Sequence, residues 1–325
     1  MKGKRSGTAT WLVTALWGLN AVGLAGVLAG VILFNNTRQP QPVSQPRALE
    51  LSVDGTPSPT SPPGIRYLPS VTPNPLTTPI EAYNTPTPFV LPQGPRPIII
   101  GYSVSGRPLE VYKFGQGERQ VMIAAGIHGG YEWNTIALAD ELITYVNDNP
   151  EIIPSDVTLF ILRNINPDGD ARSHTIEGRV NDHGVDLNRN FPENWRAEWD
   201  RDGCWDLTPT TGGSRPGSEP ETRAVMNFLS SRQVETLISY HSAALGVFPG
   251  GEPWEEESIE FAKALSKVTY YPFPPIDTGC YYTGTLADYA VSLGAVAVDM
   301  ELRNHRDTDF SQNLKALKVL LNWGK

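Results

Sequence analysis

From Ile98 to the end of the chain, short apolar runs alternate with segments of helical periodicity. A short continuous apolar run is typical of a buried strand, and apolar positions three and four residues apart are typical of an amphipathic helix. Strands that alternate with helices predict an α/β fold in which most strands are parallel. We therefore expect one globular domain over 98–325, with a mixed, mostly parallel sheet flanked by helices.

The pattern predicts both element types along this domain, without an internal repeat. Strands are expected at Gln120–Ile127, Asp156–Ile165, Glu235–Tyr240 and Ala295–Met300. Helices are expected at Trp133–Asn147, Glu219–Ser231, Glu255–Val268, Thr285–Leu293 and Asp307–Trp323.

A longer apolar run stands near the N-terminus. It extends from Trp11 to Phe34 without a charged residue and follows a short basic segment. About 20 apolar residues suffice to cross a bilayer as a helix, whereas a cleaved signal peptide has an apolar core of about 7–15 residues and a small-residue cleavage site. We expect a retained transmembrane anchor at 11–34 rather than a cleaved signal. Because basic residues mark the cytoplasmic side, residues 1–10 would be cytoplasmic and the domain over 98–325 extracytoplasmic, on a cell membrane crossed once.

Residues 35–97, between this run and the domain, are rich in Pro and Thr. More than half of the 29 prolines of the chain fall there. Proline lacks a backbone N–H and opposes both helix and sheet, so the segment is predicted to be an extended, disordered linker. A proline motif that binds a partner is the alternative.

Charge and cysteine content limit the possible partners. The formal net charge is −9, and no run rich in Lys and Arg stands outside the first residues. Binding to a phosphate backbone needs clustered basic residues, so we expect no nucleic-acid partner. The two cysteines, Cys204 and Cys280, are too few for a cysteine zinc site. In an exported domain they could form a disulfide, and two free thiols are the alternative.

Two of the five histidines follow predicted strands. His128 comes directly after the apolar run 121–127, and His241 comes after 237–240. Ligands bind at the carboxyl ends of parallel strands, so these two side chains could meet at one site. Glu132 stands four residues after His128. Two histidines, one glutamate and a water form a catalytic zinc arrangement, although Glu132 alone could simply favour a helix N-terminus.

Two further segments complete an ordered set of motifs. Asn166–Gly169 reads NPDG, and Gly184–Phe191 reads GVDLNRNF. Together with the first histidine, the Tyr-His-Ser segment at His241 and a late glutamate, this order resembles the zinc metallocarboxypeptidases over nearly all of 98–325. The segment Gly101–Leu109 resembles the bacterial branch of murein-peptide amidases and γ-D-glutamyl-meso-diaminopimelate peptidases.

The resemblance implies one Zn²⁺ ion held by His128, Glu132 and His241. Such an ion lowers the pKa of water from 15.7 towards about 7. Glu301 matches the late catalytic glutamate of the family, which takes the proton of the water and delivers it to the leaving amine. Arg179 would stabilise the oxyanion. Taken singly, these last two residues could also be ordinary surface charges.

The same resemblance assigns the residues that would bind substrate. Asn188 and Arg189 would hold a substrate carboxylate, which a guanidinium binds through two parallel hydrogen bonds. Tyr281 and Tyr282 both match the active-site tyrosine of the family, and we expect Tyr281. Asp288 lies where related enzymes contact the side chain of the departing residue. An acid there suits an amine-bearing group such as diaminopimelate, and a helix-surface acid is the alternative.

One spacing departs from the family pattern. The family reads His-x-x-Glu, whereas this chain reads His-Gly-Gly-Tyr-Glu over 128–132, which is one residue longer. No other acid lies close enough in the sequence to replace Glu132. We expect the two glycines to absorb the extra residue.

Three functional hypotheses follow. The first is a zinc peptidase that hydrolyses a peptide bond near a substrate carboxylate, in cell-wall peptides. The second is a general metallocarboxypeptidase that removes C-terminal residues from proteins and peptides; a deacylase of small acyl-amino acids shares the same chemistry. The third is an inactive cell-wall-binding domain on a membrane stalk, which predicts a missing ligand or base.

Overall fold

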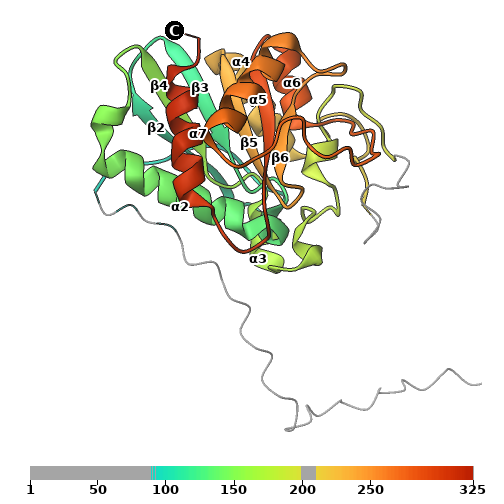
Figure 1. Ribbon diagram of the computed structural model, residues 1–325. Helices are drawn as coiled ribbons and strands as arrows, with labels where there is room; N and C mark the ends of the chain where they lie inside the picture. The colour runs from blue at the N-terminus through green and yellow to red at the C-terminus, as the bar shows by residue number, and fades with distance from the viewer. Residues whose placement is uncertain (1–88, 90, 92, 199–209, 325) are drawn as a thin grey trace, which may run out of the picture. The chain divides into compact units, whose positions relative to one another are not determined.

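The computed structural model describes residues 89, 91, 93–198 and 210–324 (Figure 1). The predicted transmembrane helix at 11–34, most of the predicted linker and Cys204 lie outside these residues. Within the described part of the chain, no helix combines the length and the apolar character that crossing a membrane requires. Cys280 is disulfide-bonded rather than free.

A seven-stranded sheet forms the centre of the domain, in the order β1-β2-β4-β3-β5-β7-β6. Its strands are β1 (Ile98–Tyr102), β2 (Pro108–Gly115), β3 (Arg119–Ala124), β4 (Val157–Leu162), β5 (Thr236–Ser242), β6 (Gly246–Pro249) and β7 (Val296–Leu302). The longer helices are α2 (Trp133–Asp148), α4 (Pro220–Arg232), α5 (Glu256–Val268), α6 (Leu286–Ser292) and α7 (Phe310–Asn322). Short helical turns are η1 (Gly129–Glu132), η2 (Pro150–Ile152), α3 (Pro167–Arg172), η3 (Ile176–Gly178) and η4 (Leu187–Arg189).

The prediction of a mostly parallel sheet is correct for the four central strands only. β4, β3, β5 and β7 pair in parallel. β1 and β2 are antiparallel on one side, and β6 is antiparallel on the other. The sequence pattern missed these three outer strands because they are short or alternate between buried and exposed positions. All nine predicted elements are present, with ends shifted by a few residues.

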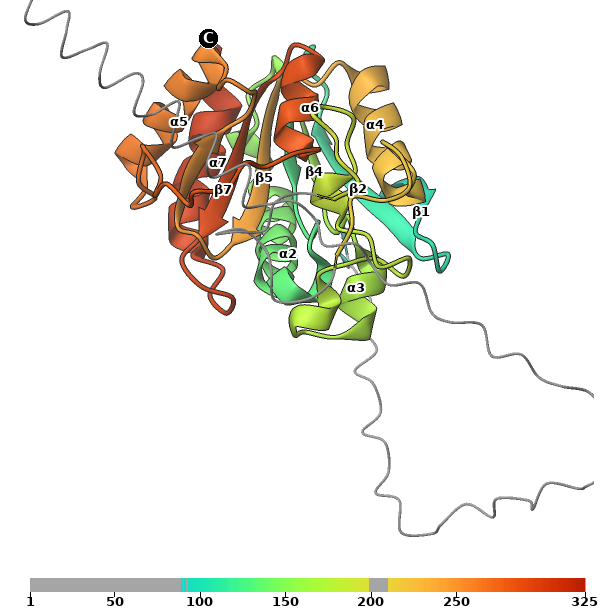
Figure 2. The ribbon, with the colours of Figure 1, turned by 90° about the vertical axis from the view of Figure 1, so that its right-hand side faces the viewer.

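Helices cover both faces of the sheet. One apolar cluster joins one face to α2, α5 and α7, and a second cluster joins the other face to α4 and α6. Figure 2 shows these helices on opposite sides of the strands. The four central strands are therefore covered on both sides, and every residue of β4 and β5 is buried.

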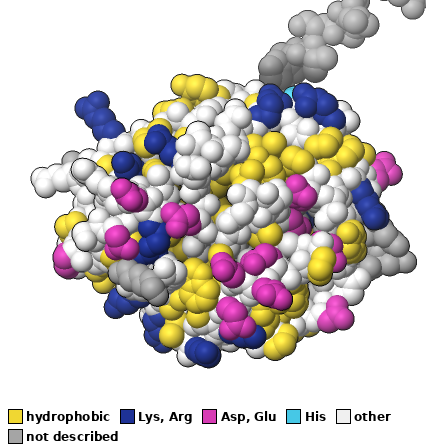
Figure 3. All heavy atoms as spheres, turned by 90° about the horizontal axis from the view of Figure 1, so that it is seen from above, with side chains coloured by type: hydrophobic (Ala, Val, Ile, Leu, Met, Phe, Trp, Pro, Cys, Tyr) yellow, Lys and Arg dark blue, Asp and Glu magenta, His cyan; other side chains and the backbone are white. Residues whose placement is uncertain are grey.

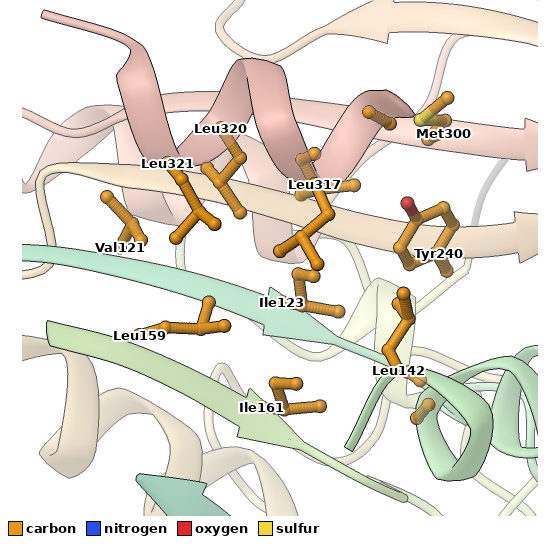
Figure 4. Packing of buried hydrophobic residues seen from close by; sticks show 14 of the residues in the cluster. Val121, Ile123, Leu142, Leu159, Ile161, Tyr240, Met300, Leu317, Leu320 and Leu321 are labelled. Atoms are coloured by element: carbon orange, nitrogen blue, oxygen red, sulfur yellow. The ribbon is translucent and has the colours of Figure 1, made fainter. Parts of the chain in front are cut away.

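The first cluster is centred on α7 (Figure 4). Leu317, Leu320 and Leu321 project from this helix towards β3, where Val121 and Ile123 are fully buried. Their spacing of three and four residues is what an amphipathic helix needs to bury one stripe. Burial of a leucine side chain contributes about 1.5–3 kcal/mol, so α7 holds the last part of the chain firmly on the sheet.

Residues ahead of Ile98 also contact this core. Phe89 and Leu91 are partly buried against the first cluster. The ring of Phe89 lies edge-on to Tyr112, with 5.7 Å between ring centroids.

On the surface seen in Figure 3, basic side chains are scattered singly or in small groups among acidic and apolar ones.

Candidate metal centre and active site

The register of the central sheet brings two of the predicted site residues together. β5 and β7 are parallel neighbours, and His241 pairs with Glu301 in their register. Both residues stand near the carboxyl ends of their strands. His128 follows the neighbouring strand β3, so it reaches the same edge of the sheet. The topology alone therefore places these three side chains at one end of the sheet.

The longer His–Glu spacing is accommodated by the turn η1. His128 precedes this single 3-10 turn and Glu132 ends it. Nδ1 of His128 lies 2.7 Å from Oε1 of Glu132, so the extra residue does not separate the two side chains. Gly129 makes the turn possible because its φ is +47° and a Cβ atom there would lie 2.7 Å from the carbonyl oxygen of Gly178.

His128, Glu132 and His241 form a buried cluster that could hold a metal ion. Their ligand atoms all lie within 4.8 Å of one another, and no other such group occurs in the described part of the chain. Nδ1 of His241 lies 3.3 Å from Oε2 of Glu132. That oxygen is buried and has no hydrogen-bond partner among the described residues. Two imidazole nitrogens and one carboxylate, with an unsatisfied buried oxygen, fit zinc.

Each histidine of the cluster has a polar side chain close to its outer nitrogen. Nε2 of His128 lies 3.2 Å from Oδ1 of Asp186. Nε2 of His241 lies 3.0 Å from Oγ of Ser239 and 3.4 Å from Oδ1 of Asp299. Such outer partners orient zinc-binding histidines and raise their basicity. Both rings therefore direct Nδ1 towards Glu132.

Electrostatics in the cluster favour a cation. Burial alone would raise the pKa of Glu132, but the charge of His128, its hydrogen bond and the charge of His241 hold that pKa well below its ordinary range. Burial would lower the pKa of His241, but Asp299 and Glu132 hold it well above its usual value. The site thus favours positive charge, either as a proton on His241 or as a metal ion in its place.

Arg179 is buried beside this cluster. Its Nη2 and Nε lie 2.9 Å and 3.0 Å from Oδ2 of Asp186, and its Nη1 lies 3.6 Å from Oε1 of Glu132. Burial would raise the pKa of Asp186, but Arg179 and His128 lower it well below the ordinary value. Asp186 therefore remains a carboxylate that positions both the guanidinium and the first histidine.

Glu301 faces the same site. Its Oε2 accepts a hydrogen bond of 3.0 Å from the backbone N–H of Ala244. Burial raises the pKa of Glu301, while the charge of His241 opposes that rise. A carboxylate whose pKa is raised is a stronger base, which suits proton abstraction from water.

Asn188 and Arg189 come from the turn η4. Oδ1 of Asn188 accepts the backbone N–H of Leu286 at 2.9 Å, so the turn is fixed to the start of α6. Nη1 of Arg189 donates to the carbonyl of Asn188 at 2.7 Å. The guanidinium of Arg189 lies over the ring of Tyr282, with 5.1 Å from Cζ to the ring centroid.

The structure places Tyr282, not the expected Tyr281, in the cavity. Tyr282 lines the cavity together with Arg189. Tyr281 is 47% exposed and contacts Arg196 at 5.2 Å instead. The two tyrosines are adjacent in the sequence, so only the conformation of the loop distinguishes them.

Asp288 lies near the beginning of α6 and faces the same cavity. Its Oδ1 accepts the backbone N–H of Gly251 at 2.8 Å. Burial raises the pKa of Asp288, and the charge of Asp299 adds to this effect. Asp288 is thus a partly buried cavity acid rather than a helix-surface acid.

One cavity of about 720 Å³ contains the metal cluster and most of the predicted site residues. Its polar lining includes His128, Tyr131, Glu132, Arg179, Asn188, Arg189, His241, Ser242, Tyr282, Thr285, Asp288, Asp299, Glu301 and His305. Its apolar lining includes Phe248, Pro249, Trp254, Pro274, Pro275 and Ile276. This combination of an apolar wall with a few converging polar groups is typical of a substrate site.

Comparison with known proteins identifies the domain. The sequence pattern of the zinc carboxypeptidases matches residues 91–318. The chain belongs to the zinc carboxypeptidase family. In this family context, the buried His–Glu–His cluster is the group of described residues that could hold the zinc ion.

Relatives within the family carry different names. A zinc carboxypeptidase of Simulium vittatum is 30% identical over 181 residues, which are 49% of this chain and 58% of that protein. Murein peptide amidase A of Escherichia coli K12 is 31% identical over 148 residues, which are 43% of this chain and 57% of that protein. The chain thus spans little more than half the length of these curated relatives.

The fold of this zinc carboxypeptidase domain is also found in solved structures. Murein-tripeptide amidase MpaA from Escherichia coli O157 superimposes with a TM-score of 0.54 at 23% identity. The match covers 73% of this chain and 94% of that chain. At 23% sequence identity, this similarity is evidence for a shared fold only.

Asp299, Tyr131 and His305 are polar residues next to the metal cluster that were missed from the sequence. Asp299 stands two positions before Glu301, so strand periodicity could have placed its side chain on the same face. Tyr131 is contributed by the extra residue of η1, and His305 comes from the loop after β7. Nothing in the sequence indicated that this loop turns back into the cavity.

Proposed function

We propose that this protein is a zinc-dependent peptidase that hydrolyses a peptide bond next to a substrate carboxylate, in cell-wall peptides. The observation that carries the proposal is the shared cavity of the His–Glu–His cluster, Glu301 and Arg189. A metal site, a base and a cation for the substrate carboxylate are the minimum set for this reaction. The zinc carboxypeptidase family supports the same chemistry.

The chemistry is divided among zinc and two side chains, Glu301 and Arg179. When bound by His128, Glu132 and His241, zinc would lower the pKa of water so that hydroxide forms near neutral pH. Glu301 takes a proton from the water and later donates it to the leaving amine. Arg179 donates hydrogen bonds to the carbonyl oxygen as negative charge develops there.

Substrate orientation comes from the other side of the cavity. Arg189 binds the carboxylate of the departing residue through its planar guanidinium, and Asn188 holds the turn that carries it. The ring of Tyr282 lies against the guanidinium of Arg189, next to the position of that carboxylate. Fixing the carboxylate fixes which peptide bond reaches Glu301.

Two features support cell-wall peptides as substrates. One relative is named murein peptide amidase A. The acid Asp288 in the cavity suits a departing residue with a second amine, such as diaminopimelate. We further propose that the apolar run 11–34 anchors the chain in the cell membrane, with the catalytic domain outside the cytoplasm.

General trimming of C-terminal residues is the second candidate. The relative named zinc carboxypeptidase favours it, because the same zinc ligands and Arg189 would serve that reaction. An inactive wall-binding domain would require a missing ligand or base. Among the described residues, each of these groups has a candidate, which argues against inactivity.

The test compares two kinds of substrate. The full chain, purified in detergent and loaded with zinc, would be incubated with L-Ala-γ-D-Glu-meso-diaminopimelate and with a pool of ordinary peptides. Mass spectrometry would identify the products, with chelated enzyme as control. We expect release of diaminopimelate from the tripeptide. Stepwise loss of C-terminal residues from the pool alone would favour the second candidate, and the absence of both products would reject the proposed activity.

A further inference from the structure

The loop that follows β7 returns to the cavity and is held there by Asn134. Nδ2 of this fully buried residue donates to the backbone carbonyls of Asn304 at 2.7 Å and Asp307 at 3.0 Å. These two carbonyls flank His305. The loop conformation, and with it the position of the His305 ring, is therefore fixed from the start of α2.

The same asparagine fixes the hydrogen atom of a neighbouring hydroxyl. Because Nδ2 of Asn134 faces two carbonyls, its Oδ1 must be the atom that faces Ser242, at 3.0 Å. A carboxamide oxygen only accepts, so the Ser242 hydroxyl donates its single hydrogen to Asn134. Oγ of Ser242 is then left as an acceptor.

This arrangement selects the tautomer of His305. Its Nδ1 lies 3.0 Å from Oγ of Ser242. Since that oxygen can only accept here, Nδ1 of His305 carries the hydrogen. In the neutral ring, Nε2 then has no hydrogen and offers a lone pair. Among the residues that the structure describes, Nε2 has no hydrogen-bond partner.

The ring itself is part of the cavity wall. His305 is half-buried and lies against Tyr131, with ring centroids 4.5 Å apart. Tyr131 stands in the lengthened segment between the two first metal ligands. Burial lowers the pKa of His305 from its ordinary value, an effect that the charge of Glu132 opposes. The neutral ring is therefore the dominant form near neutral pH.

The wall formed by Tyr131 and His305 is separate from the residues proposed to bind the departing residue. Arg189 comes from η4 and lies against the ring of Tyr282. His305 lies against Tyr131 of η1, and both pairs line the cavity that contains the metal cluster. If Arg189 holds the departing carboxylate, the substrate extends past the metal cluster towards His305 on its acyl side.

We infer that His305 is a substrate-binding residue whose Nε2 accepts a hydrogen bond from a peptide N–H on the acyl side of the scissile bond. This inference rests on the proposed peptidase function. It predicts a preference for substrates in which an amino-acid residue precedes the scissile bond, because a simple acyl group has no N–H at that position. Asn134 and Ser242 act as positioning residues that keep Nε2 available as an acceptor.

The test uses a matched pair of substrates for the zinc-loaded full chain. In one, the residue before the scissile bond carries its amide N–H; in the other, an ester oxygen replaces that N–H. Loss of one hydrogen bond is expected to reduce kcat/KM about tenfold for the wild-type chain. In His305→Ala both substrates should be hydrolysed equally, at the lower rate.

His305→Gln provides the matched control. The Gln carboxamide oxygen reaches roughly the position of Nε2 and should restore most of the preference for the N–H substrate. A merely structural role would not produce this rescue. A His305→Ala chain that keeps the full preference would overturn the inference.

A second measurement is independent of turnover. NMR of the chain labelled with ¹⁵N-histidine reports the tautomer of each ring. We expect His305 to carry its hydrogen on Nδ1 at neutral pH, and a hydrogen on Nε2 would overturn the inference. If the wild-type chain hydrolyses neither substrate, the proposed function fails, and the NMR result still decides whether the acceptor exists.

Discussion

Single residues in this site act through neighbours that set their charge or orientation. Asp186 is an example, because one carboxylate positions both Arg179 and His128. Several of these residues could be assigned from the sequence, since GVDLNRNF is a specific motif and the late glutamate follows it in the order of the family. The choice between Tyr281 and Tyr282 could not be made that way, because both satisfy the motif and only the loop conformation separates them.

Replacement of Glu301 by Gln should abolish most of the activity. Gln cannot take a proton from water, and general-base catalysis contributes about 10²–10⁴-fold to rate. We expect kcat to fall by that factor while the zinc content, measured by atomic absorption, stays at one ion per chain. The carboxamide can still accept from Ala244, so the fold should be unaffected. Undiminished turnover would show that another group is the base.

Asp288 should control the pH dependence of one substrate class only. Its pKa is raised by burial, so its carboxyl group loses its charge at higher pH than an ordinary aspartate does. As pH falls through this raised pKa, KM should increase for a substrate with an amine-bearing departing residue. A norleucine substrate of similar size should show no such increase.

Asp288→Asn supplies the control for this prediction. The variant should bind the amine-bearing substrate about tenfold less tightly at neutral pH and lose the difference between the two pH profiles. Identical profiles for both substrates in the wild-type chain would contradict a role for Asp288 in binding the amine.

At the scale of elements, the turn η1 shows how a departure from a family pattern can leave the site intact. The glycines let one extra residue fit between His128 and Glu132, as the sequence suggested. The extra residue also adds Tyr131 to the cavity wall, which the sequence did not suggest. The outer strands β1, β2 and β6 were missed because their apolar signals are weaker than those of the buried centre.

Gly129→Ala should weaken zinc binding more than it weakens folding. A Cβ atom at this position would meet three backbone atoms at 2.7–2.9 Å, so η1 must shift and separate the two ligands that it joins. We expect the zinc Kd, measured by competition with a chelator, to rise about tenfold or more. Gly106→Ala is the matched control, because Gly106 also has a positive φ but has no atom within 4 Å of the added Cβ.

If both variants showed the same zinc affinity as the wild-type chain, close packing at η1 would not determine the ligand geometry. If both lost affinity equally, the strain of a positive φ would explain the result. The prediction requires the effect to be confined to Gly129→Ala.

At the scale of the whole molecule, helix and strand periodicity sufficed for the central parallel strands and the helices that cover them. It did not define where the packed domain begins. Phe89 and Leu91 precede the apolar pattern that starts at Ile98. Because prolines surround them, this segment was predicted to be part of the linker. Their contact with the core depends on the final fold, which local sequence does not encode.

Phe89→Ala should lower the Tm of the domain. The ring packs against Tyr112 and lies 5.4 Å from the Arg163 guanidinium. Loss of these contacts should cost about 1–2 kcal/mol, because an aromatic pair contributes about 0.5–1.5 kcal/mol beyond the apolar area that it buries. Calorimetry should show a Tm lower by about 2–6 °C. Tyr102→Ala, which removes an aromatic ring that is 59% exposed, should change Tm much less.

The pairing of His241 with Glu301 has a consequence for how sequence changes are tolerated. Side chains alternate between the two faces of a sheet, so a one-residue insertion or deletion between Val296 and Glu301 would turn the glutamate to the opposite face. No loop rearrangement could compensate for that inversion. The segments around the cavity rim, in contrast, can gain or lose residues without moving either side chain. Insertions and deletions should therefore be tolerated in the loops around the cavity but not inside the strands that carry His241 and Glu301.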